Sequence, residues 1–145
     1  MVADQLPCDT FLCQLAAKTA KGLGVQNGDL VLAADFGTSS VKVGVVDSDL
    51  KLLARSTESY PLSLAPGGIA EQNPEDLWAA LVRAVEDLHQ TVSGLANRVS
   101  AVVFSSQICG VICVDENGHP LRPCLTWLDK RAADVSKDLV DGFPS

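Results

Sequence analysis

The sequence predicts an α/β fold in which a mixed β-sheet is flanked by helices, and three observations support this prediction. Three extended apolar segments follow one another, then come one long amphipathic segment and a further apolar run, an order typical of a strand reached through a crossover helix. Hydrophobic residues make up 47% of the 145 residues but aromatic residues only 5%, so the core is expected to be mostly aliphatic. Turn signals rich in Gly, Asn, Asp and Pro separate the segments.

The three consecutive segments are predicted to be strands. Residues 30–34 and 41–46 are short apolar runs, as in strands that are buried on both faces. Residues 47–49 form a turn, and residues 52–60 follow as a more polar strand. The link between the first two strands is residues 35–40.

The strongest helix signal in the chain follows a predicted loop at residues 61–68. Asn73 is placed as the cap and Pro74 as the first helical residue, with acidic residues in the first turn. Gly94 is expected to end this helix. Trp78 lies on its apolar side and is expected to anchor the core rather than to form a ligand platform.

The C-terminal part is predicted to hold two further strands, a hairpin and a helix. Residues 99–104 are expected to form a buried strand, and residues 111–114 and 124–127 a pair joined by an Asn-Gly turn. Asp129 is expected to cap a last helix that reaches about residue 140 and turns its apolar residues inward. Residues 1–28 are interpreted as an N-terminal extension with a short helix that precedes the domain at 29–145.

Charge and composition exclude several classes of partner. The net charge of −7 and the lack of a dense Lys/Arg run argue against binding to nucleic acid or an anionic membrane. No apolar stretch approaches the roughly 20 residues needed to span a bilayer, and no targeting signal is recognised, so a cytoplasmic chain is expected. Five cysteines without a CxxC spacing favour free, buried thiols over disulfides or a zinc site.

The link between the first two strands carries the side chains best suited to chemistry. Gly37 allows close approach of a ligand to the backbone. Thr38, Ser39 and Ser40 offer hydroxyls and successive N–H groups suited to phosphate, Asp35 is placed to hold a hydrated Mg²⁺, and Lys42 brings a positive charge. A plain hairpin whose Thr and Ser satisfy the turn backbone explains the same composition equally well, so both interpretations stand at this point.

Four segments together resemble a known family. The sequence DFGTSSVK at 35–42 resembles the first phosphate motif of the actin/Hsp70/sugar kinase superfamily. The segments EQNPEDLW at 71–78, SSQICG at 105–110, and GHPLRP at 118–123 running into TWLDKR at 126–131 are similar to the FGGY carbohydrate kinases. They occur in the family's order and at similar spacing.

This resemblance implies a ribonuclease-H-like fold and an ATP-dependent transfer of the γ-phosphoryl group to a sugar or polyol hydroxyl. It assigns Mg²⁺ to Asp35 and ATP phosphates to Gly37, Thr38, Ser39, Ser40 and Lys42. It assigns the sugar to Gln107, Ile108, Cys109, Trp127, Asp129 and Arg131, with Arg131 orienting either Asp129 or the sugar. Without the resemblance, Trp127 and Arg131 would be interpreted as a core aromatic residue and a solvated helix charge.

Two departures from the family limit the prediction. Ile108-Cys109 stands where pentulose kinases have Met-His, so the sugar stays open. The family's catalytic base lies beyond residue 145, which implies an incomplete first domain and an isolated chain without turnover. The alternatives are a non-catalytic nucleotide- or sugar-binding or interaction module, and a purely structural domain in which the motif is a relic; a homodimer is a further possibility.

Overall fold

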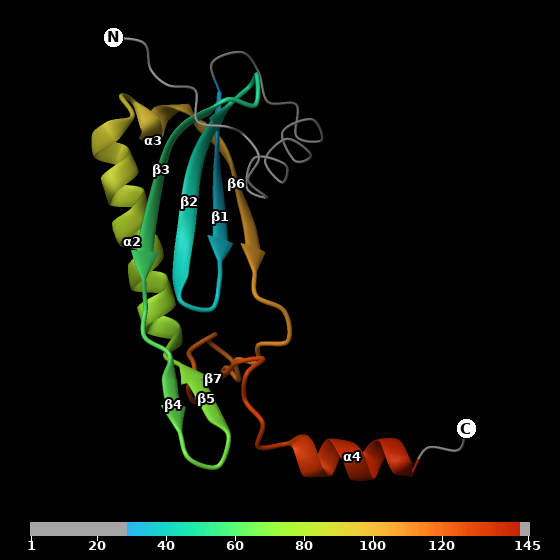
Figure 1. The fold of residues 1–145 in the computed structure, drawn as a ribbon. Coiled ribbons are helices and arrows are strands. Elements are labelled where there is room, and N and C mark those ends of the chain that lie inside the picture. The colour runs from blue at the N-terminus through green and yellow to red at the C-terminus, as the bar shows by residue number, and fades with distance from the viewer. Residues whose placement is uncertain (1–28, 143–145) are drawn as a thin grey trace. The chain divides into compact units, whose positions relative to one another are not determined.

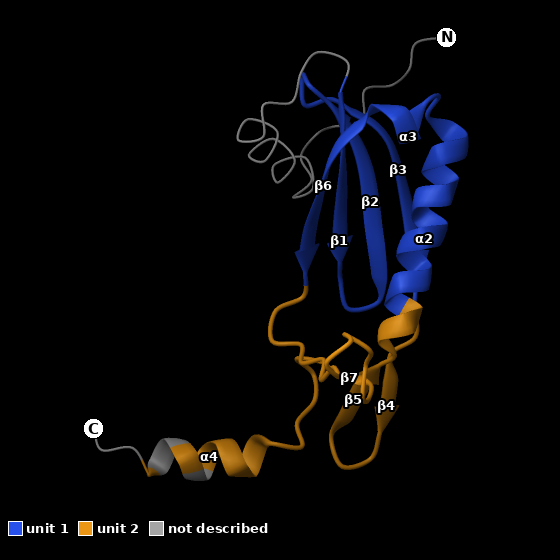
Figure 2. Ribbon diagram, turned by 180° about the vertical axis from the view of Figure 1, so that it is seen from behind, with its two compact units in different colours: residues 1–60, 77–106 blue, residues 61–76, 107–145 orange. Residues whose placement is uncertain are grey.

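The computed structural model describes residues 29–142, and the N-terminal extension expected at 1–28 lies outside this range. The described residues form two compact units (Figure 2). Unit 1 comprises residues 29–60 and 77–106, and unit 2 comprises residues 61–76 and 107–142. Each unit is described by itself.

Unit 1 is built on a four-stranded mixed sheet. Its strands are β1 (Leu30–Phe36), β2 (Ser40–Asp47), β3 (Leu52–Ser59) and β6 (Val99–Ser106), in the order β3-β2-β1-β6 (Figure 1). The first three form an antiparallel meander, and β6 lies parallel to β1. The predicted meander and crossover, and with them the mixed α/β sheet, are therefore confirmed.

Alternation along β1 divides the core of unit 1 between the two faces of the sheet. Leu30, Leu32 and Ala34 belong to a cluster with Leu81 and Leu88 of α2 (Pro74–Thr91), whereas Val31 and Ala33 belong to a second cluster. All five residues of β1 in these clusters are buried, as expected for a strand covered on both faces.

The start of α2 follows the prediction. The Asn73 side chain caps the helix, because its Oδ1 accepts a hydrogen bond of 3.2 Å from the backbone N–H of Glu75. Gly94, with φ of 68°, follows the end of the helix and leads into the short helix α3 (Leu95–Arg98).

Two expectations about burial in unit 1 are wrong. Trp78 is 62% exposed, because α2 turns Leu77, Leu81 and Leu88 toward the sheet and the next position along the helix lies about 100° away. On β6 only Val103 is buried, while Val102 and Phe104 are about half exposed at 51% and 57%, since α2 does not cover this strand as it covers β1.

Unit 2 contains a small antiparallel sheet that the sequence analysis did not anticipate. Its strands are β4 (Ser63–Ala65), β5 (Ile69–Gln72) and β7 (Cys124–Leu125), in the order β4-β5-β7. The expected loop at 61–68 is therefore wrong in part: β4 and β5 form a hairpin, and Gly67 and Gly68 supply the positive φ values of its turn.

The last third of the chain also departs from the prediction. Residues 111–114 form no strand, only isolated bridges from Val111 to Leu125 and from Val114 to Pro120, although the Asn-Gly turn is present. The helix α4 (Ala133–Asp141) begins four residues after Asp129, whose carboxylate is bonded elsewhere. Val135 and Leu139 are exposed rather than turned inward.

Two further findings concern the cysteines and the helices. Among the described cysteines Cys124 is buried as expected, but Cys109 and Cys113 are exposed, because they lie in irregular segments instead of a strand.

Within residues 29–142, none of the helices has the length and apolar character that crossing a bilayer requires.

Candidate functional site

In unit 1 the predicted phosphate residues lie in a tight hairpin between β1 and β2. The backbone N–H of Gly37 donates a hydrogen bond of 3.0 Å to the carbonyl of Ser40, which closes the turn. A Cβ added at Gly37 would lie 3.4 Å from that same carbonyl oxygen, which is an ordinary van der Waals contact. Thr38 and Ser40 are partly buried and Ser39 is exposed.

Tyr60, the residue after β3, stabilises this hairpin through two hydrogen bonds. Its backbone N–H donates to the carbonyl of Ser39 at 3.1 Å, and its hydroxyl donates to the carbonyl of Gly37 at 2.5 Å. Burial, and then the negative charge of Asp35, raise the pKa of Tyr60 to about 12, so the phenol stays protonated and remains a donor. Tyr60 was not identified as a site residue from the sequence, where it is only the last position of a predicted polar strand.

The strand register brings three polar side chains together at the end of this sheet. Asp35 of β1 is paired with Lys42 of β2 on one side and with Ser105 of β6 on the other. Residues directly opposite each other project from the same face, which here is the face away from α2. A carboxylate, an ammonium group and a hydroxyl therefore share one edge with the hairpin backbone.

The residues at this edge fit a hydrated magnesium ion better than a tightly caged metal. Within residues 29–142 no three His, Cys, Asp or Glu side chains are close enough to form a metal cage. Asp35 is partly buried and stands as a single carboxylate at the strand end. Mg²⁺ usually keeps several waters and takes one or two carboxylates together with substrate phosphates, which this arrangement permits.

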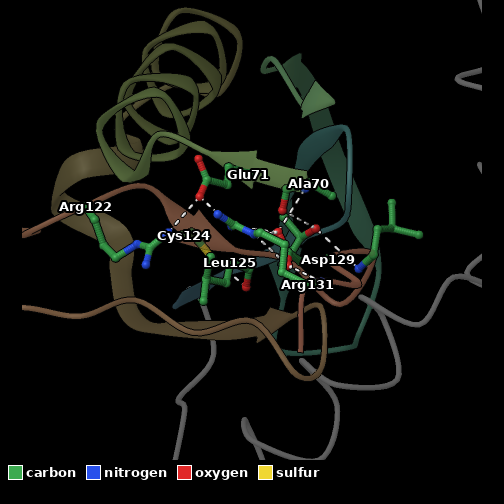
Figure 3. A network of polar contacts seen from close by, with 9 residues as sticks. Ala70, Glu71, Arg122, Cys124, Leu125, Asp129 and Arg131 are labelled. Carbon is green, nitrogen blue, oxygen red and sulfur yellow. Dashed lines mark hydrogen bonds and ion pairs between the residues drawn. The ribbon is translucent and has the colours of Figure 1, made fainter. Parts of the chain in front are cut away.

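In unit 2, two acidic and two basic residues form a connected charge network, the Glu71–Arg131 network, which consists of Glu71, Arg122, Asp129 and Arg131 (Figure 3). Oε1 of Glu71 accepts from Arg122 at 2.8 Å and from Arg131 at 2.6 Å. The Arg131 guanidinium also donates to both oxygens of Asp129. Its Nε lies 3.0 Å from Oδ1 and 3.0 Å from Oδ2, and its Nη2 lies 2.7 Å from Oδ2. The geometry is the forked pairing typical of Arg and carboxylate.

The network shifts the ionisation of its members in the directions expected for paired charges. Hydrogen bonds from Arg131, and then from the backbone N–H of Ala70, hold the pKa of Asp129 well below its usual range. Hydrogen bonds from Arg131 and Arg122 lower the pKa of Glu71, and those two carboxylates raise the pKa of Arg131. Glu71, Asp129 and Arg131 therefore remain charged near neutral pH.

Asp129 and its neighbours tie the segment at 126–131 to β5. The backbone N–H of Ala70 donates to Oδ2 of Asp129 at 3.0 Å, and Oγ1 of Thr126 donates to the carbonyl of Ala70 at 3.0 Å. The backbone N–H of Lys130 donates to the carbonyl of Gly68 at 2.8 Å. Both oxygens of Asp129 are thus engaged within the protein, and its side chain is only 9% exposed.

The other predicted sugar residues lie in the same unit. Trp127, 56% exposed, belongs to the segment that the network holds. Gln107 donates from Nε2 to Oε1 of Gln72 at 2.8 Å. Ile108 and Cys109 are exposed, and Cys109 has a positive φ of 63°.

The structure therefore brings the predicted residues together in two sets. The phosphate set of Asp35 to Lys42 is in unit 1, and the sugar set is in unit 2, where Asp129 and Arg131 contact each other directly. Glu71, Gln72 and Arg122 were not singled out as site residues. They could have been found from their positions in the segments 71–78 and 118–123, which were used only to recognise the family resemblance.

Comparison with known proteins identifies the family. A family model described as the N-terminal domain of the FGGY family of carbohydrate kinases matches residues 30–142. Among curated proteins, gluconokinase of Bacillus subtilis is 34% identical over 102 residues, which is 70% of this chain and 20% of that protein. Xylulose kinase of the same organism is 32% identical over 113 residues, 78% of this chain and 23% of that protein.

Solved structures give the same result. Gluconate kinase from Lactobacillus acidophilus superposes with a TM-score of 0.72 at 26% identity, covering 78% of this chain and 22% of that one. Ligand-bound xylulose kinase from the same organism gives a TM-score of 0.71, also at 26% identity and with the same coverage. The chain thus spans between 20% and 23% of the length of these relatives. It belongs to the FGGY family of carbohydrate kinases, whose N-terminal domain it matches.

Proposed function

We propose that this chain supplies phosphate and carbohydrate contacts to an ATP-dependent carbohydrate kinase, which moves the γ-phosphoryl group of ATP to a hydroxyl of a sugar or polyol. The observation that carries the proposal is the Asp35–Lys42 hairpin. It places a carboxylate, an ammonium group and a turn with three hydroxyl residues at one sheet edge. Family membership supports the class of reaction.

The hairpin would bind the phosphates of ATP. The backbone N–H groups and hydroxyls of Thr38, Ser39 and Ser40 are the donors, and Gly37 allows the backbone to approach the ligand closely. Lys42 would offset negative charge that the phosphates carry. Asp35 would hold Mg²⁺ through its water shell, and the ion, when bound, supplies further charge neutralisation during transfer.

The sugar would lie against the second set of residues. Gln107 would offer its amide to sugar hydroxyls, and Trp127 would offer an exposed ring to an apolar face of the sugar. The exposed residues Ile108 and Cys109 would line the same site. Asp129 and Arg131 are assigned to the same site, where Arg131 orients Asp129 and the pair holds the segment of Trp127. No residue of this chain is assigned as the catalytic base.

Some further assignments are part of the same proposal. We assign the chain to the cytoplasm, with a sugar or polyol and ATP as its small-molecule partners and with no nucleic acid or membrane as a partner. A homodimer and a domain boundary between residues 28 and 29 belong to the proposal as well.

Calorimetric titration of the chain with Mg-ATP tests the phosphate site. Asp35→Asn should weaken binding of Mg-ATP about tenfold, since a charged partner of the ion is lost. Asp49→Asn is the matched control, because Asp49 is an exposed carboxylate in the turn between β2 and β3. Equal affinities of both variants for Mg-ATP would contradict the role of Asp35.

Turnover is tested with a coupled assay for ADP, using D-gluconate, D-xylulose and glycerol as acceptors. We expect Mg-ATP binding but no acceptor-dependent release of ADP, because a general base is needed to accept the hydroxyl proton. Acceptor-dependent release of ADP would contradict the statement that the chain holds no base. Absence of binding to both ATP and the acceptors would favour a purely structural role.

A further inference from the structure

In unit 2, two glutamine side chains and one carbonyl form a chain of hydrogen bonds. Nε2 of Gln72 lies 3.4 Å from the carbonyl oxygen of Pro61, to which it donates. Oε1 of Gln72 accepts a hydrogen bond of 2.8 Å from Nε2 of Gln107. Gln72 is only 1% exposed, so the amide in the middle of this chain of hydrogen bonds is shielded from water.

The orientation of both amides follows from the end of this chain. A carbonyl oxygen only accepts, so Pro61 requires the NH₂ group of Gln72 to face it. Oε1 of Gln72 must then face Gln107, which in turn must present its own NH₂ group. The oxygen of Gln107 is therefore fixed at the opposite end of its amide.

That oxygen is buried and has no partner within the described residues. Oε1 of Gln107 has almost no solvent-accessible surface and accepts no hydrogen bond. A buried acceptor without a donor is unfavourable, so a ligand hydroxyl that displaced the groups now covering this oxygen and donated to it would remove that cost. The relay from Pro61 through Gln72 to Gln107 thus ends in an acceptor of fixed direction.

We propose that Gln72 is a positioning residue, which holds the Gln107 amide so that its Oε1 accepts a hydrogen bond from a hydroxyl group of the bound carbohydrate. The inference rests on the proposed function, which places Gln107 at the sugar. Gln72 acts only through Gln107. A site built to accept from a hydroxyl rejects an analogue that lacks it, because the buried oxygen is then left unpaired.

The first experiment tests, without any ligand, whether Gln72 holds the Gln107 amide. Hydrogen exchange of the Gln107 side-chain NH₂ group is followed by NMR in the unchanged chain and in Gln72→Met, Gln72→Glu and Gln90→Met. Exchange should be slow in the unchanged chain and in the Glu variant, whose carboxyl still accepts from Nε2, and at least about tenfold faster in the Met variant. Gln90→Met, at an exposed position of α2, is the control and should leave exchange unchanged.

The second experiment measures the affinity of the same proteins for D-gluconate, D-xylulose and glycerol by calorimetry. Gln107→Met and Gln72→Met should both weaken binding of whichever probe the unchanged chain binds, by about tenfold. Gln72→Glu should retain most of the affinity, because either ionisation state keeps an acceptor toward Gln107. If Gln72 only filled space, the apolar Met would be tolerated better than a buried carboxyl, and the order of the two variants would reverse.

The outcomes separate this inference from the proposed function. Unchanged exchange in Gln72→Met, or a Met variant that binds sugar more tightly than the Glu variant, would overturn the positioning role of Gln72. Failure of the unchanged chain to bind any of the three probes would instead overturn the carbohydrate site itself, and the exchange experiment would still decide whether Gln72 orients Gln107.

Discussion

The hydroxyl of Tyr60 donates a hydrogen bond of 2.5 Å to the carbonyl oxygen of Gly37, across 23 positions of sequence. Together with the bond from the Tyr60 backbone to Ser39, it fixes the hairpin from the β3 side. The carbonyls of Gly37, Ser39 and Ser40 thus accept hydrogen bonds within the protein, which hold the turn in one conformation. If this turn binds phosphate as proposed, little ordering is needed at the moment of binding.

The ionisation of Tyr60 is directly measurable, because it is the single tyrosine of the chain. Burial and the nearby Asp35 raise its pKa from 10.0 to about 12. Titration of the ultraviolet absorbance of phenolate should therefore show a midpoint about two units above that of a free tyrosine. A midpoint near 10.0 would mean that the phenol is exposed and does not hold the hairpin.

Replacement of Tyr60 by Phe removes the hydroxyl and keeps the ring. At neutral pH the variant should lose about 1 kcal/mol of unfolding free energy, the usual net value of one hydrogen bond. The folded-state pKa is raised, so the stability linked to this proton is fully present below 10.0 and is lost as the pH rises toward about 12. Urea denaturation across this range should show the advantage of the unchanged chain over Tyr60→Phe shrinking; a constant advantage would contradict the assignment.

The Glu71–Arg131 network should make the stability of unit 2 sensitive to acid. The pKa values of Asp129 and Glu71 are lowered from 3.8 and 4.5, so the stability linked to these carboxylates is present above about 4.5 and is lost as the pH falls further. Arg131→Met should reduce stability at neutral pH and flatten this acid dependence. The stability of Arg131→Lys should lie between those of the wild-type chain and Arg131→Met, since Lys keeps the positive charge but cannot form the two-pronged hydrogen bonds of a guanidinium.

Urea denaturation at neutral and at acid pH measures this effect, because urea does not screen charges as a salt denaturant does. Parallel acid profiles for the wild-type chain and Arg131→Met would contradict the acid-dependent stabilisation assigned to the network.

Two adjacent glycines offer a matched test of the contact between the β4–β5 turn and Lys130. Gly67 and Gly68 have φ values of 83° and 81°, so Ala is strained at both by roughly 1 kcal/mol. A Cβ at Gly68 would in addition lie 3.0 Å from Cβ of Lys130, whereas at Gly67 it would meet nothing within 4 Å. Gly68→Ala should therefore lower the unfolding free energy by about 1–3 kcal/mol more than Gly67→Ala. Equal losses in thermal or urea unfolding would contradict the close approach of Lys130.

The sheet of unit 1 and its hairpin could be predicted because local signals coincide with the fold there. Short apolar runs, an Asn73 cap and turn residues each point to the same arrangement, so the strands, the meander and α2 followed from the sequence. Burial was less predictable. Trp78 fits the apolar pattern of α2 but is not among the residues of this helix that pack against the sheet. Which residues pack there depends on how the helix is rotated about its axis where it meets the sheet.

In unit 2 the contacts that matter join residues far apart in the sequence. Glu71 meets Arg131 across 60 positions, and Ala70 meets Asp129 across 59. Local patterns carry no signal of such pairs, so Asp129 was interpreted as a helix cap although its carboxylate is taken up by Arg131 and β5. Tyr60 and Gln72 were not identified for the same reason, since each contacts residues that are distant in the sequence.

Binding of the ATP phosphates by the hairpin of residues 37–40 underlies the proposed function, and NMR titration measures it residue by residue. Addition of Mg-ATP to the isotope-labelled chain should shift the backbone amide signals of Gly37 to Ser40, whereas adenosine, which has no phosphates, should not. Unchanged hairpin amides at saturating Mg-ATP, or equal shifts with adenosine, would contradict the account.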